Sequence, residues 1–354
     1  MKEENRYIDV YRGIGIVLVL LGNLELMPEN YEIWINAFGL LLFLVAEGAL
    51  IGEKRLYERS GSKIFCLEAK RFLLPYFWIS LLIVFTECVG MVLSPLQAGG
   101  AAIVEQIMEF FSLYGGVLLW FLPVMLISVT GYQLLRKKID YIVLLVLSAI
   151  LAAVICGING IPVYLVGKSM SPEVFLLQMV YAVWRGCVGM FFCAVGEGMS
   201  MLIRWFDKKK LLLVLLGIVL MVSGSWFAIC NGRKLTISIS FRYLVTGEML
   251  LFFGAAVFLC CGLLLICRWI NECSPLEYIG KSFLIVLATC QDCKVVELAE
   301  WSGDRIFALL DHDFIRNVTV LAVVFGVEIA LLLLMQLGDR VRNHLTKVSS
   351  IFRW

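Results

Sequence analysis

The chain has 354 residues, of which 61% are hydrophobic and 16% are charged, and its formal net charge is +2. A soluble domain is roughly half apolar and about one quarter charged, so this composition excludes a soluble globular protein. The small net charge also gives no sign of a nucleic-acid partner. Long uncharged runs predict an all-α membrane protein instead.

We expect a single bundle of about ten transmembrane helices that takes up the whole chain, 1–354. The predicted spans, in chain order, are 8–26, 32–51, 72–94, 117–135, 139–156, 174–202, 211–230, 243–267, 282–300 and 317–338. The ninth is the weakest, because Gln291, Asp292 and Lys294 interrupt its apolar run. Between the third and fourth spans, the segment 101–115 carries two glutamates among apolar residues and predicts an interfacial helix.

The distribution of lysine and arginine predicts the orientation of this bundle. With the N-terminus in the cytoplasm, the loops and tails on that side hold about three times as many basic residues as the outer loops. Basic clusters such as 136–138 and 208–210 belong to the cytoplasmic side and are suited to anionic lipid headgroups. We therefore expect an N-in, C-in protein of the cell membrane that crosses it several times.

The first span holds an arginine and an asparagine on nearly the same face. An arginine at the centre of a span costs roughly 2.5–3.5 kcal/mol on insertion scales, so it is usually given a partner or a ligand. Arg12 and Asn23 are about 20° apart around the helix and about 16 Å apart along its axis. This spacing predicts a site with a cation near the cytoplasm and an amide deeper in the membrane.

The same segment carries a family resemblance. The sequence Ile8-Asp9-Val10-Tyr11-Arg12-Gly13-Ile14, followed by an apolar run, resembles the opening of the acyltransferase-3 family of integral-membrane enzymes. The mark of that family is an arginine, ten further residues, and then a histidine taken as the catalytic base. Here Arg12 matches the arginine, and Asn23 stands in the place of the histidine.

Further fragments are similar to the same family, in the same order along the chain. They are Phe38 to Gly48, with Gly39 at a histidine position and Glu47 at a serine position; Arg71 to Tyr76; Leu119 to Pro123; Arg185 with Phe192 and Gly196; and Gly280-Lys281-Ser282. The histidine that often follows the last element is absent from Ala288-Thr289-Cys290.

The resemblance implies a role for each matching position. Asn23 and Glu47 become the catalytic candidates, and Arg12, Arg71 and Arg185 become contacts for an anionic donor such as acyl-coenzyme A. The structural positions are Asp9, Trp120, Gly280 and Ser282. The implied reaction transfers an acyl group from a cytoplasmic donor to a hydroxyl of a glycan or other cell-envelope acceptor. Membrane lipids, the donor and the acceptor are the expected partners, and the sequence does not indicate an oligomeric state.

The missing histidine leaves the mechanism open. Acyl transfer to a hydroxyl benefits from a positioned base, and a carboxamide does not titrate near neutral pH. Glu47, within a span, is the preferred substitute, whereas Glu25 lies about 200° around the helix from Asn23. The alternative is that such a glutamate is an interhelical hydrogen-bonding partner or the charge partner of Arg12 or Arg185.

Two other interpretations of the function remain open. On the same fold, the protein could have lost transfer chemistry and bind or pass an acyl donor, a lipid or a sugar. An unrelated transporter also fits broken spans and buried charges.

We expect neither a metal site nor a bound cofactor. His312 and His344 are predicted to lie in an outer loop and in the C-terminal tail. The pair Cys290 and Cys293 has metal-ligand spacing, but no second pair or nearby histidine completes a zinc site.

Overall fold

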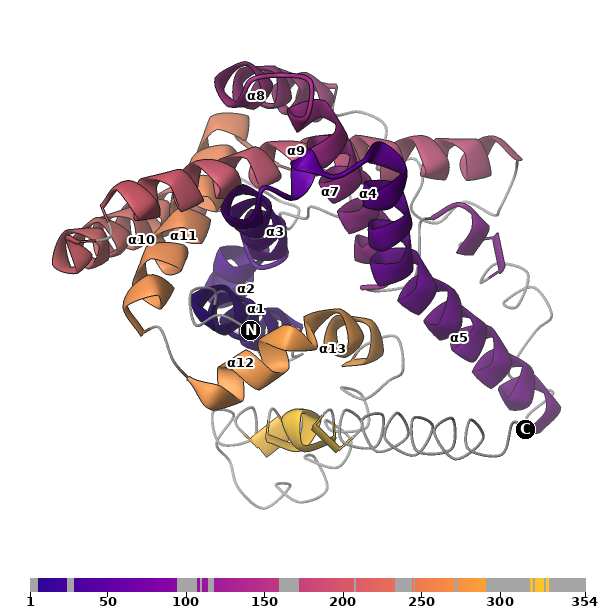
Figure 1. Cartoon of the computed structure of the whole chain (residues 1–354). Coiled ribbons are helices and arrows are strands. Elements are labelled where there is room, and N and C mark those ends of the chain that lie inside the picture. The colour runs from indigo at the N-terminus through magenta and orange to yellow at the C-terminus, as the bar shows by residue number, and fades with distance from the viewer. Residues whose placement is uncertain are drawn as a thin grey trace, which may run out of the picture. The chain divides into compact units, whose positions relative to one another are not determined.

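The computed structural model places a defined set of residues, all in helices, turns or short connections (Figure 1). The residues that it describes are 6–23, 29–93, 107–108, 110–113, 118–158, 172–206, 208–232, 244, 246–270, 273–290, 319–320, 322–327 and 329–330. The chain groups into two units, Met1–Ala288 and Thr289–Trp354. The site described below lies in the first unit, and the prediction of one domain over the whole chain stays a prediction.

Helices form most of the first unit. In chain order they are α1 (Arg6–Gly22), α2 (Glu29–Asn36), α3 (Leu41–Lys54), the 3-10 helix η2 (Leu56–Glu58), α4 (Gly61–Glu68), the π-helix η3 (Ala69–Leu73), α5 (Leu74–Leu93), α7 (Phe121–Arg136), α8 (Tyr141–Gly157), α9 (Pro172–Trp205), α10 (Lys210–Gly232), α11 (Met249–Ile270), α12 (Ser274–Lys281) and α13 (Phe283–Cys290). In the second unit, the described residues between 319 and 330 are also helical.

Four helical segments of the described chain are long and apolar enough to cross a membrane. They are Asn30–Lys54, Glu173–Trp205, Lys210–Gly232 and Met249–Ile270, and α7 and α8 are shorter apolar helices. The described residues form helices, turns and short connections, which confirms the predicted helical class, and the four apolar segments indicate a membrane protein. Ten spans and the N-in, C-in orientation stay predictions.

The outer faces of several helices are apolar. On α8, Ile142 is 71% exposed, and on α10 the exposed fractions of Leu211 and Val222 are 73% and 66%. An apolar surface that extends along whole helices is not stable in water and indicates contact with lipid. Polar groups of these helices consequently belong on the faces that are turned toward the rest of the bundle.

Small residues let the central helices approach each other closely. A Cβ atom on Gly48 of α3 would lie 2.0 Å from the carbonyl oxygen of Cys193 on α9. Conversely, a Cβ atom on Gly196 of α9 would lie 2.1 Å from the carbonyl oxygen of Val45. Such close approach is typical of helix pairs in membranes, and it fixes α3, which carries Glu47, against α9.

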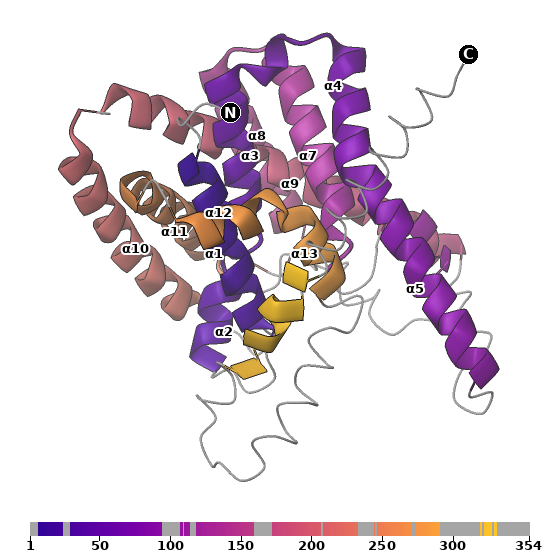
Figure 2. The same ribbon diagram turned by 60° about the horizontal axis from the view of Figure 1, so that its bottom comes forward.

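Another close contact joins the beginning of the chain to its later part. A Cβ atom on Gly13 of α1 would lie 2.2 Å from the carbonyl oxygen of Leu276 on α12. Figures 1 and 2 both show α12 beside α1. This contact brings the start of α13 close to the buried arginine of α1.

Two predicted spans are built differently from our expectation. The span 32–51 is interrupted by a turn at residues 37–40, between α2 and α3. The span 72–94 is the later part of a longer helix, because α4, η3 and α5 follow one another without a break from Gly61 to Leu93 (Figure 2). The segment 61–71 is therefore helical and contributes side chains to the site.

Several predictions concern residues outside the described part of the chain. These residues include Glu25, Cys293, His312 and His344, together with most of the interfacial segment 101–115, residues 291–300 of the ninth predicted span and most of the tenth.

Candidate functional site

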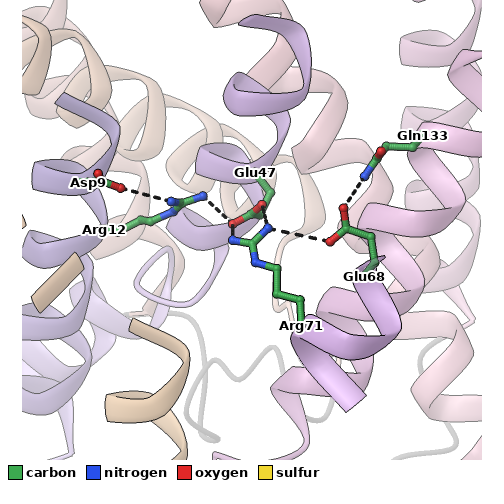
Figure 3. Close-up of polar contacts among 6 residues, drawn as sticks. All are labelled: Asp9, Arg12, Glu47, Glu68, Arg71 and Gln133. Atoms are coloured by element: carbon green, nitrogen blue, oxygen red, sulfur yellow. Dashed lines mark hydrogen bonds and ion pairs between the residues drawn. The ribbon is translucent and has the colours of Figure 1, made fainter. Parts of the chain in front are cut away.

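The centre of the candidate site is Glu47 on α3, whose residue exposure is 1%. Its Oε1 atom accepts hydrogen bonds from Nη2 of Arg12 at 2.5 Å and from Nη2 of Arg71 at 2.6 Å. Its Oε2 atom accepts from Nη1 of Arg71 at 2.7 Å. One buried carboxylate thus holds two guanidinium groups, and its contact with Arg71 is bidentate (Figure 3).

Polar side chains extend this arrangement in both directions. Asp9 accepts from Nη1 of Arg12 at 3.3 Å, and Oε2 of Glu68 lies 3.8 Å from Nη1 of Arg71. Gln133 on α7 donates through Nε2 to Oε1 of Glu68 at 2.9 Å. We call the six residues drawn in Figure 3 the Glu47 cluster: Asp9, Arg12, Glu47, Glu68, Arg71 and Gln133.

The π-helix η3 positions Arg71. A π-helical turn holds one more residue than an α-helical turn and is frequent at functional sites. Pro75 offers a sequence reason, since a proline ring clashes with the carbonyl group four residues earlier, here that of Arg71. The local widening therefore follows from the Arg71–Pro75 spacing, and it places Arg71 where it can reach α3.

Accessibility differs strongly among the three central side chains. The side chain of Arg71 is 31% exposed, that of Arg12 is 7% exposed, and that of Glu47 is 1% exposed. A ligand that enters the helix bundle would therefore meet Arg71 before it could reach Arg12 or Glu47.

Burial and neighbouring charges shift the pKa values of Glu68 and Arg71, which lie outside the predicted spans. Burial raises the pKa of Glu68, and the nearby Arg71 offsets this only in part. Burial alone would lower the pKa of Arg71, but the Glu47 carboxylate outweighs it and raises that pKa. Arg71 consequently stays cationic.

An aromatic ring, which the sequence analysis did not select, packs against both arginines. The guanidinium carbon of Arg12 lies 5.1 Å from the centre of the Phe283 ring, and that of Arg71 lies 6.0 Å from it. Phe283 also stacks on Phe43, with ring centres 5.0 Å apart. Its position directly after Gly280-Lys281-Ser282 is the only sequence signal that points to it.

The predicted structural residues Gly280 and Ser282 lie at the joint that carries this ring. A Cβ atom on Gly280 would lie 1.8 Å from the carbonyl oxygen of Asp9. The backbone N–H of Ser282, which separates α12 from α13, donates to the carbonyl of Ile279 at 3.0 Å. These two positions therefore set where α13 begins relative to α1.

Asn23 is not brought into the Glu47 cluster. It follows the last residue of α1, and its Nδ2 atom donates to the carbonyl oxygen of Val19 at 2.6 Å. Ten helical residues lie between it and Arg12, a separation of about 16 Å along the helix axis. The shared site with Arg12 and the catalytic role of Asn23 stay predictions.

Arg185 and Trp120 form a separate pair. Arg185 is fully buried, and its guanidinium carbon lies 4.9 Å from the centre of the Trp120 ring. Its Nε atom donates to the carbonyl of Tyr181 at 3.3 Å. The structural role of Trp120 and donor binding by Arg185 both stay predictions.

A second buried glutamate has a comparable environment elsewhere in the first unit. Glu197 on α9 accepts from the hydroxyl of Tyr132 at 2.6 Å and from Nε of Arg136 at 3.0 Å. It fits the alternative that the sequence left open, in which a glutamate bonds between helices. Glu47 also fits it, as the charge partner of Arg12.

The chain was compared with protein-family models, curated proteins and solved structures. No family model matches the chain, and neither a curated protein nor a solved structure was found to match it.

Proposed function

We propose that this chain is a multi-pass cell-membrane protein of the acyltransferase-3 type, with about ten spans and both termini in the cytoplasm. Its reaction would transfer an acyl group from a cytoplasmic donor, such as acyl-coenzyme A, to a hydroxyl of a glycan or other cell-envelope acceptor. One observation carries the proposal. The fragments selected by resemblance around Arg12, Glu47, Arg71 and Gly280 are far apart in sequence, yet they lie together in the structure.

The proposed donor contact is the guanidinium group of Arg71. A planar guanidinium matches the oxygens of a phosphate in a bidentate manner, as it matches a carboxylate. Arg71 is also the more exposed of the two arginines that contact Glu47. Arg12 adds a second positive charge and keeps Glu47 neutralised.

The chemical step needs a proton acceptor. In the proposed reaction, the acceptor hydroxyl oxygen forms a bond to the thioester carbonyl carbon and the carbon–sulfur bond breaks. A base takes the hydroxyl proton and passes it to the leaving thiolate. Glu47 is the titratable candidate in the cluster, and such a base contributes about 10²–10⁴-fold. Asn23 could donate to the acyl carbonyl.

A second candidate function is supported by a specific observation. Both oxygens of Glu47 already accept hydrogen bonds from arginines, and the Asn23 amide donates to its own helix. Neither candidate catalytic group is positioned to take a proton in this arrangement. The same contacts suit a protein that binds an anionic acyl donor, lipid or sugar without transferring the acyl group.

The two functions are distinguished by measuring acetyl-coenzyme A binding and consumption with the full chain in nanodiscs. Transfer predicts consumption by the parent protein and a loss of at least about tenfold in Glu47→Gln. Non-catalytic binding predicts an affinity that depends on Arg71, with no consumption. Glu197→Gln is the matched control, because it also removes a buried, arginine-paired carboxylate.

Asn23→His tests the missing base directly. Histidine titrates near neutral pH, so this variant should gain acyl transfer if the family frame is intact. A chain that neither binds acetyl-coenzyme A nor consumes it, as parent or variant, would contradict acyl transfer and acyl-donor binding. It would leave lipid or sugar binding and the transporter alternative.

A further inference from the structure

We propose that Glu47 is an internal stand-in for a phosphate group and occupies Arg71 until a phosphate-bearing ligand displaces it. Identifying that ligand as the acyl donor rests on the proposed function. The exchange itself is a property of the Glu47 cluster. In this exchange, Arg71 releases Glu47 and binds the phosphate, whereas Arg12 stays paired with Glu47.

The hydrogen-bonding geometry supports an exchange on Arg71. Nη1 and Nη2 of Arg71 donate to the two different oxygens of Glu47, at 2.7 Å and 2.6 Å. A phosphate presents two oxygens to a guanidinium in the same bidentate way. Glu47 therefore occupies the donor positions that a phosphate would need.

Glu47 would keep a partner after the exchange. Its Oε1 atom also accepts from Nη2 of Arg12 at 2.5 Å, and this bond does not involve Arg71. A buried carboxylate left without a cation is strongly disfavoured. Because Arg12 remains in place, Arg71 can turn to a ligand without leaving Glu47 unpaired.

The charges of the cluster make Glu47 a competitor of any anion. The cluster contains three carboxyl groups, on Asp9, Glu47 and Glu68, and two guanidinium groups, on Arg12 and Arg71. It therefore has no excess of positive charge to attract a phosphate. Removing the charge of Glu47 shifts this balance in favour of an anionic ligand while both arginines stay.

The test measures inorganic pyrophosphate binding by calorimetry, with the full chain in nanodiscs of uncharged lipid. Glu47→Gln should bind pyrophosphate about tenfold more tightly than the parent protein, since a charge-assisted competitor is lost. Arg71→Gln should remove this binding. Glu197→Gln should bind like the parent, although it also removes the charge of a buried glutamate paired with an arginine.

Equal or weaker pyrophosphate binding by folded Glu47→Gln, or none by either protein, would overturn the proposal. If this variant does not fold, Glu47→Asp replaces it. Its shorter side chain cannot reach both arginines as well, so binding should again be tighter than in the parent, and weaker or unchanged binding would overturn the proposal.

Acetyl-coenzyme A separates this proposal from the proposed function. Tighter pyrophosphate binding by Glu47→Gln, without any acetyl-coenzyme A binding, would support the exchange on Arg71. It would contradict the identification of the ligand as an acyl donor. Acetyl-coenzyme A binding that is no tighter in Glu47→Gln than in the parent would support acyl-donor binding. It would contradict the exchange of Glu47 for a phosphate on Arg71.

Discussion

Gly280 and Asp9 are in backbone contact across two helices, with so little space that a Cβ atom on Gly280 would lie 1.8 Å from the Asp9 carbonyl oxygen. Gly280→Ala must therefore separate α12 from α1 or distort one of them. We expect a loss of about 1–3 kcal/mol in the free energy of unfolding, measured by thermal unfolding in detergent. Gly157→Ala is the control, because no atom of the described residues lies within 4 Å of a Cβ atom there. Equal effects of the two substitutions would contradict the predicted packing.

Breaking the buried ion pair should destabilise the protein more than breaking an exposed one. Arg12→Ala removes one charge-assisted hydrogen bond from buried Glu47, which keeps Arg71 as a partner, and should cost about 1.5–3 kcal/mol. Arg55→Ala removes a pair with Glu58 whose side chains are 65% and 61% exposed, and should cost about 0–1 kcal/mol.

A double-mutant cycle isolates the pairing of Arg12 with Glu47. Arg12→Ala, Glu47→Ala and the double variant should give a coupling of about 0.5–3 kcal/mol, since residues in direct contact are not independent. Additive losses would show that the two side chains stabilise the fold separately.

Glu68 should make stability depend on pH. Burial raises its pKa above the ordinary value of 4.5, so the folded protein binds this proton more tightly than the unfolded chain does. The resulting stabilisation is complete below pH 4.5 and is lost as the pH rises through the raised pKa. Thermal unfolding from pH 4 to 8 should therefore show Glu68→Gln gaining stability relative to the parent as the pH rises.

The control for the Glu68 measurement is Glu58→Gln, which also removes one glutamate but at a side chain that is 61% exposed. The predicted trend must be confined to Glu68→Gln. A stability difference between Glu68→Gln and the parent that stays constant from pH 4 to 8 would contradict the raised pKa of Glu68.

The proposed topology is tested by reporter fusions. Fusions after Lys210 and Arg342 should report the cytoplasm, and fusions after Gly99 and Gly303 should report the outer side, because the basic residues favour this orientation. An outer location of the C-terminal tail would contradict the even number of spans.

Much of the helical pattern could be predicted from the sequence because membrane spans are long and apolar. The predicted span 211–230 corresponds to α10, Lys210–Gly232. The turn at 37–40 was missed because that segment is as apolar as its surroundings. The segment 61–71 lay outside every predicted span, although it forms α4 and most of η3.

Individual members of the site could be predicted, but not their pairing. Arg12 and Glu47 stood out as charges within apolar runs, which are rarely left without a partner. Glu68 and Gln133 were missed because their part in the site depends on where α4 and α7 pack. Which buried carboxylate meets which arginine follows from helix rotation and is not a property of any single segment.

The π-helix also changes the rotational phase of the long helix that contains it. Each residue of an α-helix turns the chain by roughly 100°, so one additional residue in a turn rotates everything after it by about that amount. Before this point, Glu68 is buried against its partners, and after it Phe77 and Phe85 face outward. Deleting one residue within 69–73 would bring the two halves back into phase. Either Arg71 would then turn away from Glu47, or Phe77 and Phe85 would turn away from the outer surface of the bundle.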